Sequence, residues 1–145
     1  MGAFTVLPLM IIPIIIYNVM AWADATFATA EELSARLNEP FQSVHMASGA
    51  DWVITPGHAL MVVALVTLFF ELLKSTGIGR AAIMNHAFSM LLFIFCLIEF
   101  LMFEAFATSV FFLIMLMALM DVMAGFIVTI ASARRDFAVG EGLGG

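Results

Sequence analysis

The residues that could carry chemistry are ionisable groups set inside long apolar runs. Asp121 lies within Met-Ala-Leu-Met-Asp-Val-Met-Ala-Gly-Phe, and Glu71, His86 and Glu99 have similar surroundings. Such groups are costly in a membrane span and usually face the bundle interior, so each is a functional hypothesis. The favoured interpretation is that Asp121 is protonated and joins two helices by a hydrogen bond worth about 1 kcal/mol, while the other groups lie at the membrane interfaces. The alternative orders them by expected depth into a ladder that would conduct protons: Glu71 and His86, then Asp121, then Glu99 and Glu104.

Two of the three histidines raise the question of a haem or chlorophyll site. His58 is expected near the outer end of the second apolar run, and His86 near the inner end of the third. A haem held by two histidines needs both at one depth, so these two cannot share one metal. The alternative left open is a pigment or haem that takes His86 or His58 as its single axial ligand.

No other reaction motif occurs in the sequence. It has no nucleophile–base signature, no phosphate-binding glycine loop and no metal-ligand spacing, and its one cysteine, Cys96, cannot form an internal disulfide. The net charge of −6 argues against a nucleic-acid partner, which would call for a basic surface. We therefore predict that the protein is not an enzyme and holds no metal or cofactor, with lipid as its surroundings.

Composition indicates what positions these groups. Hydrophobic residues make up 64% of the 145 residues and charged ones 11%, whereas a soluble domain has roughly 45–50% and about 25%. A chain this short cannot hide that excess in a core, so we predict an all-α membrane protein with one domain, residues 1–145. A spanning helix needs about 20 mostly apolar residues. Four stretches qualify: residues 4–22, 56–73, 81–103 and 109–133. Pro13 is expected to kink the first of them.

Basic residues predict the orientation of these four transmembrane helices. Lys74 and Arg80 flank the second connection, and Arg134 and Arg135 follow the fourth span. All four lie on one side if the chain crosses four times, and the positive-inside rule makes that side cytoplasmic. Both termini are then cytoplasmic, and the acidic residues 23–55 lie outside. Residues 21–23, Ala-Trp-Ala, also fit a signal-peptidase site, but no positive charge precedes the apolar run, so we expect an uncleaved anchor.

The outer segment, residues 23–55, is expected to contain a short helix and a β-hairpin. Thr29 and Glu32 form a capping-box pattern before a helix that should end ahead of Pro40. Residues 44–46 and 51–54 then predict two strands joined by a turn at Gly49. A lone hairpin is marginally stable in water. It is therefore expected either to fold onto the bundle as a lid or to dock a partner, with Trp52 as its anchor and Trp22 at the membrane interface.

Small residues in the fourth span favour close helix contact near Asp121. Gly125 and Thr129 are spaced as in the small-xxx-small pattern, with Ala118 and Ala124 close by. The sequence therefore places a helix-packing surface beside the carboxyl group.

Several stretches together resemble a family of small alphaproteobacterial membrane proteins without an assigned activity. The matching stretches are residues 71–76, 86–90, 99–101, 107–109, 121–122, 124–126 and 133–136, with residues 46–49 and Trp52 in the outer segment. The resemblance covers about two thirds of the chain. It implies a four-helix fold in a bacterial inner membrane, with residues 23–55 in the periplasm, and it implies no chemistry.

The leading functional hypothesis is a non-catalytic accessory or structural subunit. It would pack in a larger membrane complex or against copies of itself. A proton or small-ion pathway through the intramembrane carboxyl groups is the first alternative, and a pigment- or haem-associated subunit is the second.

Overall fold

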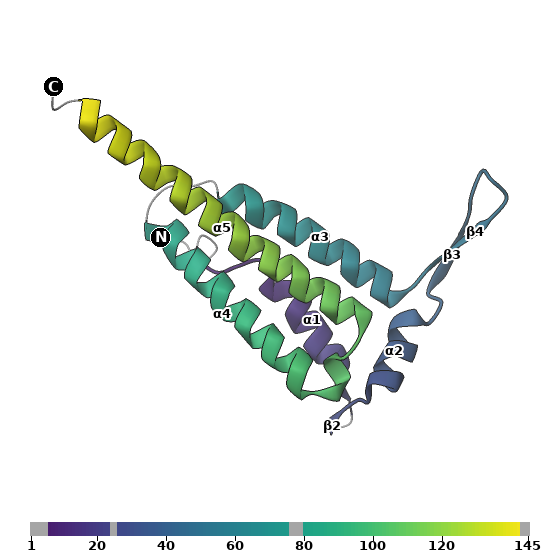
Figure 1. Cartoon of the computed structure of the whole chain (residues 1–145). Helices are drawn as coiled ribbons and strands as arrows, with labels where there is room; N and C mark the ends of the chain where they lie inside the picture. The colour runs from purple at the N-terminus through teal and green to yellow at the C-terminus, as the bar shows by residue number, and fades with distance from the viewer. Residues whose placement is uncertain (1–5, 24–25, 76–79, 143–145) are drawn as a thin grey trace.

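Three helices are long and apolar enough to cross a membrane. The computed structural model describes residues 6–23, 26–75 and 80–142, most of them helical (Figure 1). The long helices are α3 (Pro56–Ser75), α4 (Arg80–Met102) and α5 (Ser109–Gly142), and the apolar part of α5 ends at Ala131. Helix α5 packs along both α3 and α4, which touch each other far less. A mainly helical fold with apolar spans is therefore confirmed.

The first predicted span is helical only in part. Helix α1 covers Ile11–Ala21, and residues 6–10 before it form turns. Eleven residues rise about 16 Å, roughly half the hydrocarbon thickness of a bilayer. The prediction that Pro13 kinks a helix is wrong, because Pro13 lies in the first turn of α1, where a backbone N–H would lack a helical partner anyway. Residues 1–5 of the predicted span lie outside the described part.

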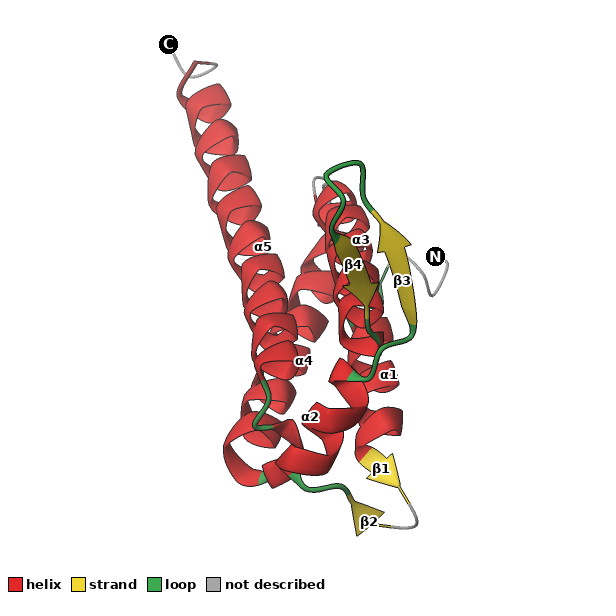
Figure 2. Cartoon of the chain, turned by 90° about the vertical axis from the view of Figure 1, so that its right-hand side faces the viewer, coloured by secondary structure: helices red, strands yellow, loops and turns green. Residues whose placement is uncertain are grey.

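The two ends of the bundle are distinguished by the elements that begin and end there. At one, here called the hairpin end, α1 and α4 end and α3 and α5 begin; at the other, called the Lys74 end, α3 ends and α4 begins (Figure 1). The strands β1 (Trp22–Ala23) and β2 (Thr26–Phe27) and the helix α2 (Ala30–Asn38) lie at the hairpin end (Figure 2). The turn η2 (Glu104–Phe106) joins α4 to α5 there.

An aromatic cluster closes the core at the hairpin end. The Tyr17 ring lies 4.7 Å from that of Phe111 and 5.5 Å from that of Phe106, centroid to centroid. The Tyr17 hydroxyl is 3.0 Å from the Ala105 carbonyl oxygen, to which it donates, and 2.6 Å from Thr108 Oγ1. These contacts fix the end of α1 to the connection between α4 and α5.

Helix α2 forms as predicted. The Thr29 side chain accepts a hydrogen bond from the Glu32 backbone N–H, and the Glu32 carboxylate accepts one from the Thr29 backbone N–H. The buried side chains of Leu33 and Leu37 share one face, as their spacing requires. Helix α3 approaches closely at Gly57, where a Cβ atom would lie 2.9 Å from the Leu37 carbonyl oxygen. The glycine therefore permits this contact between α2 and α3.

The capping box predicts a pH-dependent α2. The hydrogen bond from the Thr29 backbone N–H holds the pKa of the exposed Glu32 carboxyl below its usual range. Because the folded-state pKa is the lower one, this stabilisation is complete above the unfolded-state pKa of about 4.3 and is lost as the pH falls through the folded-state value. Amide hydrogen exchange in α2 should therefore accelerate at low pH. Glu32→Gln, which cannot titrate, should remove that dependence, and an unchanged pH profile in this variant would contradict the assignment.

The predicted β-hairpin is present and stands apart from the bundle (Figure 1). Strand β3 (Gln42–His45) pairs antiparallel with β4 (Asp51–Ile54), and Gly49 takes a positive φ of 83° in the turn. Every residue of both strands is exposed except Ile54, which is half-buried. The expectation of a lid folded onto the bundle is therefore wrong, because neither face of the hairpin is covered.

Candidate functional site

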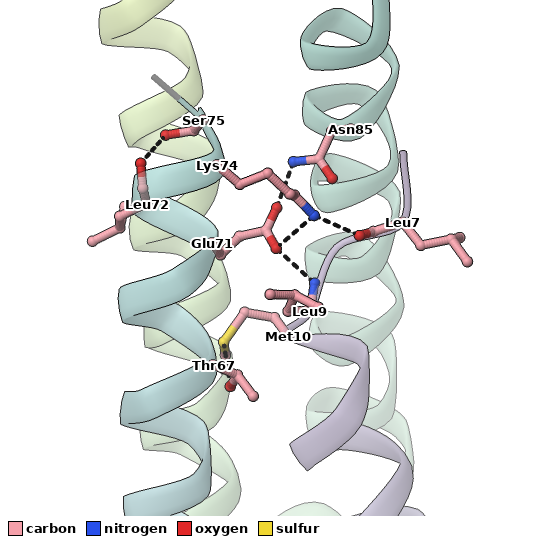
Figure 3. A network of polar contacts seen from close by, with 9 residues as sticks. All are labelled: Leu7, Leu9, Met10, Thr67, Glu71, Leu72, Lys74, Ser75 and Asn85. Atoms are coloured by element: carbon pink, nitrogen blue, oxygen red, sulfur yellow. Dashed lines mark hydrogen bonds and ion pairs between the residues drawn. The ribbon is translucent and has the colours of Figure 1, made fainter. Parts of the chain in front are cut away.

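Glu71 is the centre of a buried polar network near the Lys74 end of the bundle (Figure 3). Its side chain has no solvent exposure. One carboxylate oxygen, Oε2, accepts a 2.7 Å hydrogen bond from the Leu9 backbone N–H and forms a 3.0 Å ion pair with Lys74 Nζ. The other, Oε1, accepts a 2.5 Å hydrogen bond from Asn85 Nδ2. Lys74 Nζ also donates to the Leu7 carbonyl oxygen at 2.6 Å.

This network satisfies the non-helical start of α1. Irregular backbone at membrane depth is tolerated only where protein groups or water satisfy its polar atoms. Glu71 and Lys74 do so for Leu9 and Leu7, and the carboxylate lies near the positive end of the α1 dipole. Glu71 was considered as one step of a proton ladder. In this structure it instead joins the segment before α1 to helices α3 and α4.

A second buried polar group lies beside the first, between α4 and α5. Asn85 and Ser89 are four residues apart on α4 and share a face, and Asp121 on α5 lies close to Ser89. All three are buried: Asn85 is 4% exposed, Ser89 2% and Asp121 3%. Asn85 Oδ1, Ser89 Oγ and Asp121 Oδ2 nevertheless have no hydrogen-bond partner in the described part of the chain. Native interiors leave few such atoms, so this group calls for an explanation.

Gly125 makes room for His86. A Cβ atom on Gly125 would collide with His86 Nδ1. The imidazole also packs edge-on against Phe126, with centroids 4.8 Å apart. Both ring nitrogens are buried without a hydrogen-bond partner among the described residues. The packing surface predicted at Gly125 thus brings α5 against a histidine of α4.

Glu99 belongs to a separate site, toward the hairpin end. It is 5% exposed, and its Oε2 lies 3.4 Å from Asn18 Nδ2 of α1. Glu99 is ten positions after Ser89 on α4, a rise of about 15 Å, and residues 90–98 between them are all apolar. Glu104 lies further along and is exposed. The carboxyl groups expected as one ladder therefore form two groups with an apolar layer between them.

The remaining predicted residues lie at the hairpin end. His58 is exposed and caps α3, because its Nδ1 accepts from the Thr55 N–H while Thr55 Oγ1 accepts from the His58 N–H, both at 3.3 Å. Trp22 packs edge-on against Phe27, with centroids 4.8 Å apart. Trp52 stands 52% exposed on the hairpin. The side chains of Arg80, Arg134 and Arg135 lie outside the described part.

An apolar groove runs between α1 and α4. Its volume is about 570 Å³, and Asn18 is the one polar side chain in its lining. The other lining residues are aliphatic or aromatic: Ile11, Ile14, Ile15, Val19, Trp22, Phe27, Leu92 and Phe95. Lipid chains could fill such a groove in a bilayer, and nothing in its lining indicates a reaction.

Several of these polar groups were not expected from the sequence. Asn85 and Ser89 could have been noticed from their helical spacing on the face that carries His86, whereas nothing local links Tyr17 to Thr108, 91 residues away.

No protein-family model matches the chain, and no curated protein or solved structure shows significant similarity to it. The resemblance to the alphaproteobacterial family therefore stays a prediction.

Proposed function

We propose that this chain is a non-catalytic accessory subunit of the bacterial inner membrane, docked in a larger complex or in a homo-oligomer. The observation that carries the proposal is the uncovered hairpin. Two strands alone are marginally stable in water, so an ordered hairpin standing clear of its own bundle favours a surface completed by a partner.

The strand register gives the hairpin two unlike faces. Val44 is paired with Trp52, so these apolar side chains share one face. His45 is paired with Asp51 on the other face, where His45 Nδ1 lies 2.8 Å from Asp51 Oδ1. The Trp52 face is the docking surface in this proposal, because exposed tryptophan dominates many protein interfaces.

The proposed topology has four crossings, with both termini in the cytoplasm and residues 23–55 in the periplasm. Three long apolar helices support three of the crossings. The first is supported by the contacts of its two ends: Leu7 bonds to Lys74 at one end of the bundle, and Tyr17 bonds to Ala105 at the hairpin end. Cysteines introduced one at a time test this arrangement. Ser43→Cys should react with a membrane-impermeant thiol reagent in intact cells and Ser75→Cys should not; the reverse pattern would refute the orientation.

Replacing the aromatic anchor tests the docking surface. The double variant Val44→Ala, Trp52→Ala should lose co-purifying partner subunits, or oligomerisation, under mild detergent, as read by native mass spectrometry. Ser43→Ala on the opposite face is the matched control and should keep them. Truncating a central interface tryptophan typically weakens binding by about 2 kcal/mol or more, roughly thirtyfold. Recovery of the unaltered protein only as a lone monomer would reject the proposal.

The ion-pathway alternative is favoured by one observation, the buried carboxyl group of Asp121 with an oxygen that has no described partner. Vesicles containing the protein and a pH-sensitive dye would then show proton flux that Asp121→Asn abolishes. The apolar layer between Ser89 and Glu99 opposes this reading, because no described polar side chain of α4 bridges it. We therefore rank it second.

A further inference from the structure

The unpartnered oxygens near the Lys74 end come from three different side chains. Asn85 Oδ1, Ser89 Oγ and Asp121 Oδ2 belong to residues that are each more than nine-tenths buried. The Asn85 amide nitrogen is already committed to Glu71, which leaves the oxygen as the free end of that side chain. A carboxylate, an amide carbonyl and a hydroxyl are the oxygen ligands that hard cations prefer.

The helix packing holds these side chains together. Asn85 and Ser89 share a face of α4, and the close contact of His86 with Gly125 brings that part of α4 against α5. Four residues before Gly125 on the same face of α5 is Asp121, whose carboxyl group interacts with the Ser89 side chain. The position of the three oxygens is therefore set by a helix–helix contact and does not depend on a loop.

The charges of the described side chains around this cluster do not balance. Glu71 and Asp121 contribute two negative charges when ionised, and Lys74, which interacts with both, contributes one positive charge. The described carboxyl and lysine groups thus leave one net negative charge. His86 is the other titratable group that α4 presents here, and its nitrogens have no described partner. An uncompensated buried charge is strongly destabilising, and a bound cation would neutralise this one.

We propose that Asn85 Oδ1, Ser89 Oγ and Asp121 Oδ2 form a binding site for one monovalent metal cation, of the size and hardness of Na⁺. A single positive charge neutralises the cluster, whereas a divalent ion would leave an excess of +1. Water completes the coordination shell. The site is independent of the docking role proposed above, and it requires no transport.

Thermal unfolding of the full-length protein in detergent tests the site with sodium itself as the probe. At pH 8 and constant ionic strength, replacing choline chloride by NaCl should raise Tm saturably, by roughly 3 °C or more. Asp121→Asn should abolish the rise, and Ser89→Ala should shift its midpoint to higher sodium. Glu104→Gln, which removes an exposed carboxyl at the other end of the bundle, should respond like the unaltered protein.

Competition with protons gives a second measurement that does not depend on the stability of a variant. Lowering the pH should move the sodium midpoint to higher concentration as a proton takes the cation's place on Asp121. An identical Tm in sodium and choline at pH 8 would overturn the proposal and leave a protonated Asp121 as the neutralising group. Equal sodium responses in the unaltered protein and in Asp121→Asn would overturn it as well.

Discussion

Glu71→Ala should lower the free energy of unfolding by about 3–5 kcal/mol, the usual cost of removing one partner of a buried ion pair. The carboxylate accepts from Leu9 and Asn85 and pairs with Lys74, so the alanine variant leaves three polar groups without their acceptor. Unfolding in mixed detergent micelles, followed by circular dichroism, measures the change. The expected structural consequence is detachment of the non-helical segment before α1.

Two comparisons make that experiment specific. Glu104→Ala removes an exposed carboxyl from η2 and should change stability by no more than about 0.5 kcal/mol. Glu71→Gln keeps the shape and one acceptor oxygen, so its cost should fall between the two. If Glu71→Ala unfolds like Glu104→Ala, the network does not hold the start of α1.

Gly125→Ala should cost about 1–3 kcal/mol, because its methyl group would lie where the His86 ring now sits. The ring has little freedom to move away, since it also packs against Phe126. Unfolding free energies of the single and double variants form a thermodynamic cycle. In a His86→Ala background the same glycine substitution should cost much less, and it could even stabilise α5 through the better helix propensity of alanine.

The cycle separates crowding from other effects of the glycine. If Gly125→Ala lowers the free energy of unfolding equally in the unaltered protein and in His86→Ala, then the His86 ring is not what the added methyl group clashes with. A coupling energy above about 0.5 kcal/mol would confirm direct contact between these positions.

Local patterns in the sequence were sufficient for some elements and insufficient for others. The three long spans, the helix capped by Thr29 and the hairpin at Gly49 follow from hydropathy, capping and turn chemistry, which act over a few residues. The first span was predicted too long as a helix. Its non-helical start depends on Glu71 and Lys74, which are more than sixty residues away in the sequence. Patterns that extend over a few residues cannot predict such a contact.

The candidate site was predicted as a set of residues but not as an arrangement. Asp121, Glu71 and Glu99 are all buried, as expected for ionisable groups in apolar runs. Depth along a helix could not show that Glu71 faces α1 and Asn85, or that Glu99 faces Asn18, because depth says nothing about rotation around the helix axis. The expectation of a lid was wrong because the apolar side chains of the hairpin that would have packed on the bundle, Val44, Trp52 and Val53, are all exposed.

The segment before α1 depends on Glu71 and Lys74, which the ribosome adds more than sixty residues later. This dependence has a consequence for membrane insertion during synthesis. When the ribosome has completed only the first apolar segment, the Leu7 carbonyl lacks its donor, Lys74, and the Leu9 N–H lacks its acceptor, Glu71; both come later with α3. An eleven-residue helix is a weak substrate for independent partitioning from the translocon into lipid. Integration of the N-terminal segment should therefore be delayed until Glu71 and Lys74 emerge. Nascent chains arrested before residue 71 should remain extractable from the membrane by alkaline carbonate.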